Sequence, residues 1–369
     1  MAAIRMASVG VGGMGRNHVK AVTDIKGSTL VAVSDVVAKT AKAVGEEYGV
    51  PYFTDHRKML DEVKLDAITI ATPHPQHAPV AVDAMNAKKH VFTEKPMAST
   101  VSDCDKMIAA AKKNRVKLSV MYQQRTRAVN QKAKSLIKSG KIGSLVRVNM
   151  IAANMRTQAY YNSGGWRGTW EFEGGGVLLN QAPHQIDLLL WLTGLPKRVT
   201  GLVSTFAHKI EVEDTASAIL EYPNGAHGAI QVGTVEAPGG TRYEIAGTKA
   251  TLRLEGSKLR MAVLAEPSDK FMRTTKEAWG RIPSEWKDIE VKESASTHIG
   301  GVTAMIKDFV VALQKKRPSL CPAQEGRMSV ELANAMIMSS VLGKTVELPL
   351  DPKKYDGILR KLIRQKGLK

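Results

Sequence analysis

The chain has few cysteines, few aromatic residues and no long apolar run. Its 369 residues include only Cys104 and Cys321, far apart in sequence, which excludes a disulfide framework and a cysteine-based zinc site. No segment approaches the roughly 20 apolar residues that span a bilayer, and the N-terminus MAAIRMASVGVGG enters a strand pattern without an apolar signal core. We therefore expect a cytoplasmic protein with reduced cysteines and no membrane partner.

Acidic residues are also scarce relative to basic ones, and the formal net charge is +18. Such a charge raises the alternative of a nucleic-acid-binding protein, whose binding to duplex DNA would depend steeply on salt. No nucleic-acid motif accompanies the charge, and aromatic residues make up only 5% of the chain, which leaves little for base stacking. We therefore expect a generally basic surface and no nucleic-acid partner.

The length and the patterning predict two domains and a helical tail. Up to residue 124, short β-branched runs such as RMASVG, LVAVSD and DAITIAT alternate with amphipathic stretches, which is typical of a Rossmann-type, doubly wound parallel sheet. Residues 125–350 hold strand pairs joined by Asn-Gly and Gly-Thr turns, followed by two late helices, and predict an α+β domain with a large, mainly antiparallel sheet. Residues 351–369 predict a basic amphipathic helix.

The motif GVGGMG places Gly10, Gly12 and Gly15 directly after the first predicted strand and at the start of a helix. Glycines there permit a tight turn and a close approach of a pyrophosphate to backbone amides. Asp35 ends the second predicted strand, where a carboxylate accepts hydrogen bonds from an adenosine ribose. No arginine adjoins it to clamp a 2′-phosphate, so NAD is favoured over NADP. The alternative is a glycine-rich turn without a ligand.

Two further stretches hold candidate chemistry. FTEKPMAST puts Lys95 at the end of a later strand, where an ammonium can stabilise developing alkoxide charge; the alternative is a surface lysine beside a turn proline. GGGVLLNQAPHQIDLLLWLTG carries Asn180 and His184 at the start of an apolar helix. Asn180 has a second interpretation as the N-cap of that helix, because Pro183 is tolerated only in a first turn, and His184 has one as a core histidine.

At these motifs the chain resembles the Gfo/Idh/MocA oxidoreductase family, from about Arg5 to about Pro349. The matching stretches are GVGGMG, ATPHPQHAPVAVDAMNAKKHVFTEKP and WRGTWEFEGGGVLLNQAPHQIDLLLWLTG, in that order. The resemblance implies that Lys95 and His184 flank the nicotinamide and the reacting carbon, one from each domain. Many members carry Asp where this chain has Asn180, so Lys95 and His184 remain as the proton-handling pair.

The segment from Asn154 to Gly176 holds five of the chain's nineteen aromatic residues, among them Tyr160 and Trp166. Aromatic faces with polar neighbours suit a sugar ring, although an oligomer interface would explain the tyrosines equally well. His74 and His77 lack further ligands nearby, so we expect no metal.

These observations lead us to expect an NAD-dependent dehydrogenase that reversibly oxidises a secondary hydroxyl of a sugar, glycoside or cyclitol, as a homodimer or homotetramer. The alternative is a non-catalytic NAD-binding regulatory protein of the same fold. The expected catalytic residues are Lys95, His184 and Asn180. The expected substrate contacts are Arg125, Tyr160, Trp166, Asn180 and His184. The expected cofactor contacts are Gly10, Gly12, Gly13, Met14, Gly15, Asp35, Thr72, Pro73, His77, Glu94, Lys95, Gln123, Trp166 and Arg167.

Overall fold

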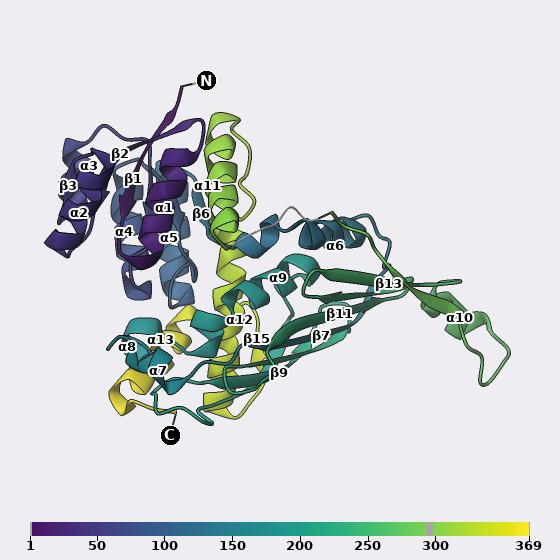
Figure 1. Cartoon of the computed structure of the whole chain (residues 1–369). Coiled ribbons are helices and arrows are strands. Elements are labelled where there is room, and N and C mark those ends of the chain that lie inside the picture. The colour runs from purple at the N-terminus through teal and green to yellow at the C-terminus, as the bar shows by residue number, and fades with distance from the viewer. Residues whose placement is uncertain (1, 293–297, 369) are drawn as a thin grey trace. The chain divides into compact units, whose positions relative to one another are not determined.

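The chain divides into two units, and a computed structural model describes residues 2–292 and 298–368 (Figure 1). Unit 1 comprises Met1–Thr126, Glu171–Gly174 and Ser296–Glu331. Unit 2 comprises Arg127–Trp170, Gly175–Ala295 and Leu332–Lys369. Each unit is discontinuous, whereas the sequence predicted contiguous domains. Within the described residues no helix is both long and apolar enough to cross a membrane.

Unit 1 is built on a six-stranded parallel sheet. Its strands are β1 (Ile4–Val9), β2 (Ser28–Ser34), β3 (Tyr52–Phe53), β4 (Ala67–Ile70), β5 (His90–Thr93) and β6 (Leu118–Val120). Their order is β3-β2-β1-β4-β5-β6, and every neighbouring pair is parallel. The predicted doubly wound sheet is confirmed, while the very short β3 gave no alternating pattern and was missed. Ligands of such sheets bind outside the carboxyl ends of the strands, where the strand order reverses beside β1.

The helices of unit 1 are α1 (Gly13–Asp24), α2 (Ala38–Tyr48), α3 (His56–Glu62), α4 (His74–Asn86), α5 (Val101–Asn114), α11 (His298–Gln314) and the 3₁₀ turn η1 (Gln123–Thr126). Helices α8 (Trp170–Glu173) and α12 (Ala323–Leu342) contain residues of both units. Helix α11 lies beside α1 (Figure 1), and its Phe309 ring packs 5.4 Å from the ring of Phe92 on β5. This apolar contact places α11 in unit 1, whereas the sequence assigned it to the second domain.

Unit 2 is built on a nine-stranded sheet. Its strands are β7 (Leu145–Ala153), β8 (Arg198–Ser204), β9 (Thr215–Glu221), β10 (His227–Gly233), β11 (Gly240–Gly247), β12 (Ala250–Glu255), β13 (Lys258–Leu264), β14 (Ser284–Asp288) and β15 (Val346–Glu347). The order is β14-β13-β12-β11-β7-β10-β9-β8-β15. Strands β7 and β10 are parallel, and all other neighbours are antiparallel. The predicted mainly antiparallel sheet is confirmed.

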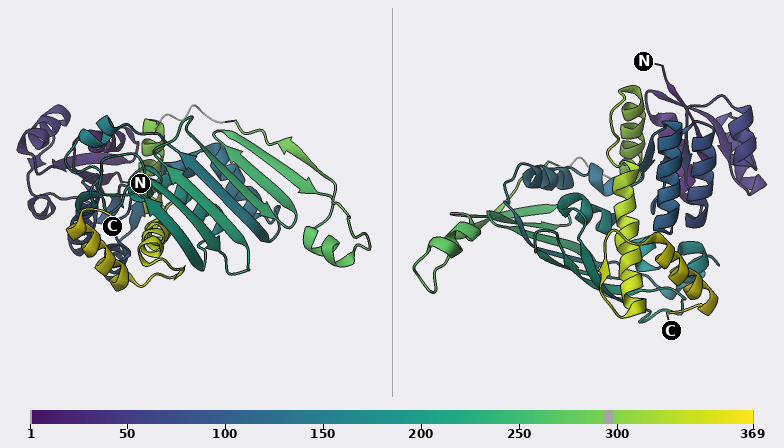
Figure 2. Two further views of the ribbon diagram at one scale, coloured as in Figure 1. Left: turned by 90° about the horizontal axis from the view of Figure 1, so that it is seen from below. Right: turned by 180° about the vertical axis from the view of Figure 1, so that it is seen from behind.

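Helices cover one face of this sheet and leave the other open (Figure 2). The helical elements of unit 2 are α6 (Ala128–Lys138), α7 (Gln158–Asn162), α9 (Pro183–Thr193), α10 (Ser268–Thr274), α13 (Pro352–Gln365) and the π-helical turn η2 (Val177–Gln181). On β9, Ala218 and Leu220 are buried, whereas Ser217 and Ile219 between and beside them are exposed. This alternation is typical of a sheet with one solvated face.

Helix α13 forms the predicted amphipathic tail. Asp351 caps it by accepting hydrogen bonds from the amides of Lys353 and Lys354. Tyr355, Leu359 and Leu362 recur at helical spacing and are buried, while the lysines and arginines of α13 are exposed on its other faces. Burial of such an apolar side chain stabilises a fold by about 1.5–3 kcal/mol, so the tail is an integral part of unit 2.

Candidate functional site

The turn between β1 and α1 requires glycine at two positions. Gly10 has a φ of +76°, and a Cβ on it would lie 2.9 Å from the carbonyl of Ala71. A Cβ on Gly15 would lie 1.8 Å from the carbonyl oxygen of Gly10. No side chain fits at these distances, so the helix and the turn meet through bare backbone.

Gly12 and Gly13 face open space instead. A Cβ on either would meet no atom of the described residues within 4 Å. Gly12 is the N-cap of α1, and no described side chain caps the first amides of the helix. These amides carry the positive end of the helix dipole, and beside them Met14 is 37% exposed. The turn therefore fits the pyrophosphate of a dinucleotide.

Asp35 ties the end of β2 to the glycine turn. Its Oδ2 accepts a hydrogen bond from the amide of Val11 and its Oδ1 one from the amide of Val37, each at 2.9 Å. A carboxylate has about four acceptor positions, so the group keeps capacity for ribose hydroxyls. The next two residues, Val36 and Val37, are 89% and 55% exposed and offer no cation for a 2′-phosphate. The residues present therefore fit NAD.

The ends of β4 and β5 meet through His77. Its Nδ1 lies 2.8 Å from the carbonyl oxygen of Pro96, and its Nε2 lies 2.8 Å from that of Thr72. Burial lowers the pKa of this ring, so a neutral imidazole donates to one of the two carbonyls at a time. His77 is fully buried. It therefore holds the two loops together. The sequence predicted a cofactor contact at His77, but in this structure its side chain is inaccessible.

Thr72 and Pro73 lie where the sequence predicted a cofactor surface, between β4 and α4. The Oγ1 of Thr72 is buried, and it has no hydrogen-bond partner among the described residues. A buried hydroxyl without a partner is costly in a folded protein and is satisfied by a ligand donor or acceptor. Pro73 is the N-cap of α4 and has no backbone N–H to satisfy. Both residues fit a surface against which a dinucleotide packs.

Lys95 follows β5 at the same sheet edge as the glycine turn, because β1, β4 and β5 are parallel neighbours. The side chain is half-buried. The carboxylate of Glu94 is 8% exposed, and its Oε2 accepts a hydrogen bond from the amide of Lys95 at 3.0 Å. Gln123, at the start of η1 beyond β6, is 7% exposed. These three predicted residues thus follow the last two strands of the sheet.

Arg125 does not present its charge at a surface, contrary to the expected substrate contact. The side chain is completely buried, and its guanidinium donates to the Glu325 carboxylate and to the carbonyl oxygen of Leu320. All three residues belong to unit 1. A guanidinium neutralised in this way holds η1 against the start of α12, which is a structural role. No motif predicted the Glu325 partner, which lies two hundred positions away along the chain.

In unit 2 the predicted substrate residues gather around Tyr160. Its hydroxyl accepts a hydrogen bond from the Arg167 guanidinium at 2.8 Å and one from the Asn180 amide at 3.4 Å. The guanidinium also lies 4.4 Å from the Tyr160 ring centroid and 4.2 Å from that of Trp166. Cation–π contacts of this kind fix both rings beside a positive charge. The structure therefore brings together Tyr160, Trp166, Arg167 and Asn180.

Asn180 does not cap the helix that follows it, so the capping interpretation is wrong. The N-cap of α9 is Ala182, without a side-chain hydrogen bond, and Asn180 lies in the π-helical turn η2. Asn180 is the fourth residue of this π-helical turn, and such turns are frequent at functional sites. Its side-chain amide is therefore directed to Tyr160. His184 is half-buried in the first turn of α9, after Pro183 at its first position.

Glu213 holds this segment in place and was missed by the sequence analysis. It is completely buried, and its Oε1 accepts hydrogen bonds from the amides of Gly176 at 2.8 Å and Leu178 at 3.0 Å. A Cβ on Gly176 would lie 1.9 Å from the Glu213 carbonyl oxygen. The absence of a side chain at Gly176 thus allows the segment before β9, which carries the carboxylate, to approach closely. The acidic pair before β9 was the one available signal in the sequence, and it had no motif around it.

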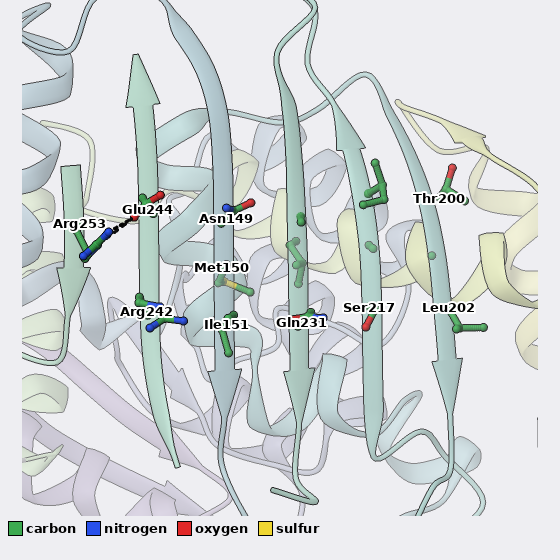
Figure 3. A pocket seen from close by; sticks show the side chains of 15 residues that line it. Asn149, Met150, Ile151, Thr200, Leu202, Ser217, Gln231, Arg242, Glu244 and Arg253 are labelled. Atoms are coloured by element: carbon green, nitrogen blue, oxygen red, sulfur yellow. Dashed lines mark hydrogen bonds and ion pairs between the residues drawn. The ribbon is translucent and has the colours of Figure 1, made fainter. Parts of the chain in front are cut away.

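Two hollows of unit 2, formed by residues that the structure describes, contain neither Asn180 nor His184. One of about 560 Å³ is lined by the loop that includes Arg167 and by residues around Lys209. The larger, of about 770 Å³, lies on the open face of the nine-stranded sheet (Figure 3). It shares no residue with the cluster around Tyr160, so we do not regard it as the site of chemistry. The described ranges contain no group of three or more His, Cys, Asp or Glu side chains that could hold a metal ion.

The contrast between Gly13 and Gly15 gives a matched pair of variants. We expect Gly15→Ala to lower the melting temperature, because its methyl group would collide with the Gly10 carbonyl. Gly13→Ala meets no protein atom and replaces a glycine in a helix, so thermal stability should be unchanged or raised by up to about 1 kcal/mol. Its methyl group would lie where a pyrophosphate binds, so calorimetric titration should show weaker NAD binding. Unchanged NAD affinity in Gly13→Ala would contradict this position for the pyrophosphate.

Comparison with known proteins identifies both parts of the chain. Residues 4–122 match the model of an oxidoreductase family with an NAD-binding Rossmann fold, and residues 130–253 match the GFO/IDH/MocA C-terminal domain. The inositol 2-dehydrogenase of Salmonella paratyphi B is 25% identical over 369 aligned residues, which cover 95% of this chain and 99% of that protein.

Solved structures extend the comparison. The WlbA dehydrogenase from Bordetella pertussis, in complex with NADH and UDP-GlcNAcA, is 31% identical with a TM-score of 0.79, covering 95% of this chain and all of that one. Levoglucosan dehydrogenase in complex with NADH has the same TM-score at 20% identity and the same coverage of both chains, and shares the fold. The chain therefore belongs to the GFO/IDH/MocA family of NAD-binding oxidoreductases.

Proposed function

We propose that the protein is an NAD-dependent dehydrogenase that reversibly oxidises a secondary hydroxyl of a sugar, glycoside or cyclitol to a ketone. One observation carries the proposal: the half-buried Lys95 ends a strand at the same sheet edge as the uncapped glycine turn. A cation beside a dinucleotide site suits a reaction in which a substrate oxygen gains negative charge. The inositol and WlbA dehydrogenases to which the chain is similar support this class of substrate.

The proposed roles follow from the chemistry of each side chain. NAD, when bound, supplies the hydride acceptor. Lys95 stabilises the negative charge that develops on the substrate oxygen, and His184 takes the hydroxyl proton as general base. Asn180 is a neutral amide and orients the substrate together with the Tyr160 hydroxyl. Trp166 and Tyr160 offer ring faces to the apolar C–H face of a sugar.

A second candidate substrate is a sugar that carries a carboxylate or a nucleotide. The guanidinium of Arg156 lies 5.3 Å from the Tyr160 ring centroid, and that of Arg167 lies 4.4 Å from it. Two cations beside one aromatic ring favour an anionic group. The WlbA structure at 31% identity contains UDP-GlcNAcA, an acidic nucleotide sugar, whereas the inositol 2-dehydrogenase relative is 25% identical.

The deciding experiment is a screen for NADH formation over inositols, hexoses, aryl glycosides, uronic acids and UDP-linked uronic acids. NADH formation with a neutral polyol supports the first candidate, and turnover restricted to acidic sugars supports the second. Tight NAD binding without turnover of any substrate would favour the alternative, a non-catalytic NAD-binding regulatory protein.

We expect the protein to bind NAD more tightly than NADP, because the Asp35 carboxylate repels a 2′-phosphate and the exposed Val36 and Val37 offer no counter-charge. Replacing Asp35 with Ser should weaken NAD binding and narrow the difference between the two cofactors. Titration calorimetry with both cofactors measures the effect. Tighter binding of NADP by the unmodified protein would refute the assignment.

Lys95→Ala should lower kcat far more than it weakens NAD binding, because the ammonium acts on the reacting oxygen. Loss of a positioned electrostatic donor commonly costs about 10²–10³ in rate. Steady-state kinetics and a separate NAD titration distinguish the two effects. Normal turnover by the variant would assign Lys95 a structural role.

The variant Asn180→Asp should stay active and move the pH dependence of oxidation. A carboxylate near His184 favours the charged imidazole and raises its pKa, so the base becomes protonated, and the rate falls on acidification, at a higher pH. His184→Ala should remove this pH dependence together with most of the rate. An identical pH profile in wild type and Asn180→Asp would show that Asn180 does not act on the acid–base group.

The open face of the large sheet favours assembly into a homodimer or homotetramer. Figure 3 shows Leu202 and Ile151 on this face, and the paired Glu244 and Arg253 lie farther along it. Ile219, in the same hollow, is 59% exposed. Apolar side chains followed by opposite charges are typical of a face that a second copy covers.

Light scattering tests the assembly. We expect Ile219→Lys to shift the protein toward monomer, because the charge would be buried between copies. The control Val263→Lys places the same charge on β13 at a side chain that is 52% exposed, but three residues from Arg260 and so on the opposite face. A wild-type monomer at micromolar concentration would contradict the proposed interface.

A further inference from the structure

A buried histidine on α1 has no part in the mechanism proposed above. His18 is completely inaccessible, five residues into the helix that begins at the glycine turn. Its Nε2 lies 3.0 Å from Oε1 of Glu94, the residue before Lys95. A hydrogen bond compensates buried polar groups for their loss of hydration. This pair therefore forms a stabilising contact between α1 and the end of β5.

The hydrogen bond identifies the tautomer of His18. Its Nδ1 is buried and has no hydrogen-bond partner among the described residues. The Phe92 ring, 6.1 Å away between centroids, forms part of its apolar surroundings. A proton on Nδ1 would be an unsatisfied donor, whereas a proton on Nε2 points at a carboxylate. We therefore assign the proton to Nε2, which donates to Glu94.

Glu94 passes this contact on to Lys95. The carboxylate oxygen that His18 leaves available, Oε2, accepts the backbone N–H of Lys95 at 3.0 Å. A glutamate side chain has three rotatable bonds, and hydrogen bonds to both of its oxygens restrict them. One donor is His18 on α1, and the other is the backbone N–H of Lys95, which follows Glu94 after β5. The contact with α1 therefore bears on the backbone at Lys95.

Glu94 lies among other titratable side chains, so the position of its carboxylate affects their pKa values. Its carboxylate acts electrostatically on His74 and His77, raising the pKa of both rings against the larger effect of burial, while Lys95 lowers them. Burial wins at His74, whose pKa falls to about 3. Glu94 and Lys95 therefore act on these two rings with opposite signs.

We propose that His18 is a positioning residue: through Glu94 it fixes the backbone of Lys95, and so couples the cofactor-binding helix to the side chain that acts on the substrate. The inference rests on the proposed function for its kinetic consequence. Its structural part, the immobilised Lys95 amide, is independent of any activity.

Two variants of His18 distinguish the effect of losing the hydrogen-bond donor from the effect of losing the volume of the ring. The amide nitrogen of Gln superimposes on Nε2 of a histidine, and that of Asn on Nδ1. His18→Gln therefore keeps a donor for Glu94, whereas His18→Asn places its donor where the structure has no acceptor. Both variants replace the ring by a smaller amide, so a loss of packing alone would affect both.

Hydrogen exchange of the Lys95 amide, followed by mass spectrometry with residue-level fragmentation, reads out the coupling in the NAD-free protein. We expect exchange in His18→Asn to be about 10-fold faster than in wild type, and exchange in His18→Gln to stay near wild type. On a substrate found in the screen, His18→Asn should lower kcat by about 10-fold while NAD affinity changes less than about 2-fold, and Gln should restore most of the rate.

The outcomes are distinct. Wild-type exchange at Lys95 in His18→Asn would overturn the inference, as would equal damage from Gln and Asn, because packing would then be the cause. In the Lys95→Ala variant, adding His18→Asn should lower the residual rate no further. If the added substitution lowered the rate as much as it does in the wild type, the inference would also be overturned. If the wild type turns over no substrate, the proposed function fails, and the exchange result alone decides whether His18 positions Lys95.

Discussion

The close approach of Gly15 to the carbonyl oxygen of Gly10 is the contact on which the cofactor half of the protein depends. Because no Cβ separates them, α1 starts directly at the end of β1 and aims its uncapped amides along the sheet edge where β4 and β5 also end. Unit 2 contains the same kind of constraint, where Gly176 admits the Glu213 carbonyl. In both units a missing side chain allows backbone to meet backbone, and the polar residues of the site follow within a few positions.

Carboxylates order the backbone around these turns. Glu94 links α1 to the Lys95 amide, Glu213 holds the amides of Gly176 and Leu178, and Asp35 holds that of Val11. Glu94 and Glu213 are buried, whereas Asp35 is partly exposed. Asp35 and Glu213 accept from amides far away in the sequence, and Glu94 accepts from the neighbouring amide of Lys95 and from His18 on α1. A chain with a net charge of +18 therefore uses several of its few acidic residues to order loops. The charge of the buried Arg125 is likewise compensated within the protein, by the Glu325 carboxylate.

Much of the fold and part of the site could be read from local patterns. Gly10, Gly15 and Asp35 belong to one continuous unit of β1, the glycine turn, α1 and β2, so their spacing alone predicted that they would lie at one sheet edge. Asn180 shows the limit of this reasoning. A polar residue ahead of Pro183 and an apolar run looks like an N-cap, but the segment forms a π-helical turn and α9 begins after Ala182. This turn is stabilised by two hydrogen bonds that the amides of Gly176 and Leu178 donate to Glu213, a residue more than thirty positions away.

The sequence by itself determined the alternation of strands and helices, the glycine turn, the absence of an arginine beside Asp35 and the residue types at positions 95, 180 and 184. These are properties of neighbouring residues, and backbone sterics and hydrogen bonding act over such short distances. Only the tertiary structure decided that Arg125 is neutralised inside unit 1, that His77 bridges two loops, that His18 reaches Glu94 and that α11 packs on α1. Burial and pairing depend on which distant segments the packed core brings into contact, and no local pattern encodes that choice.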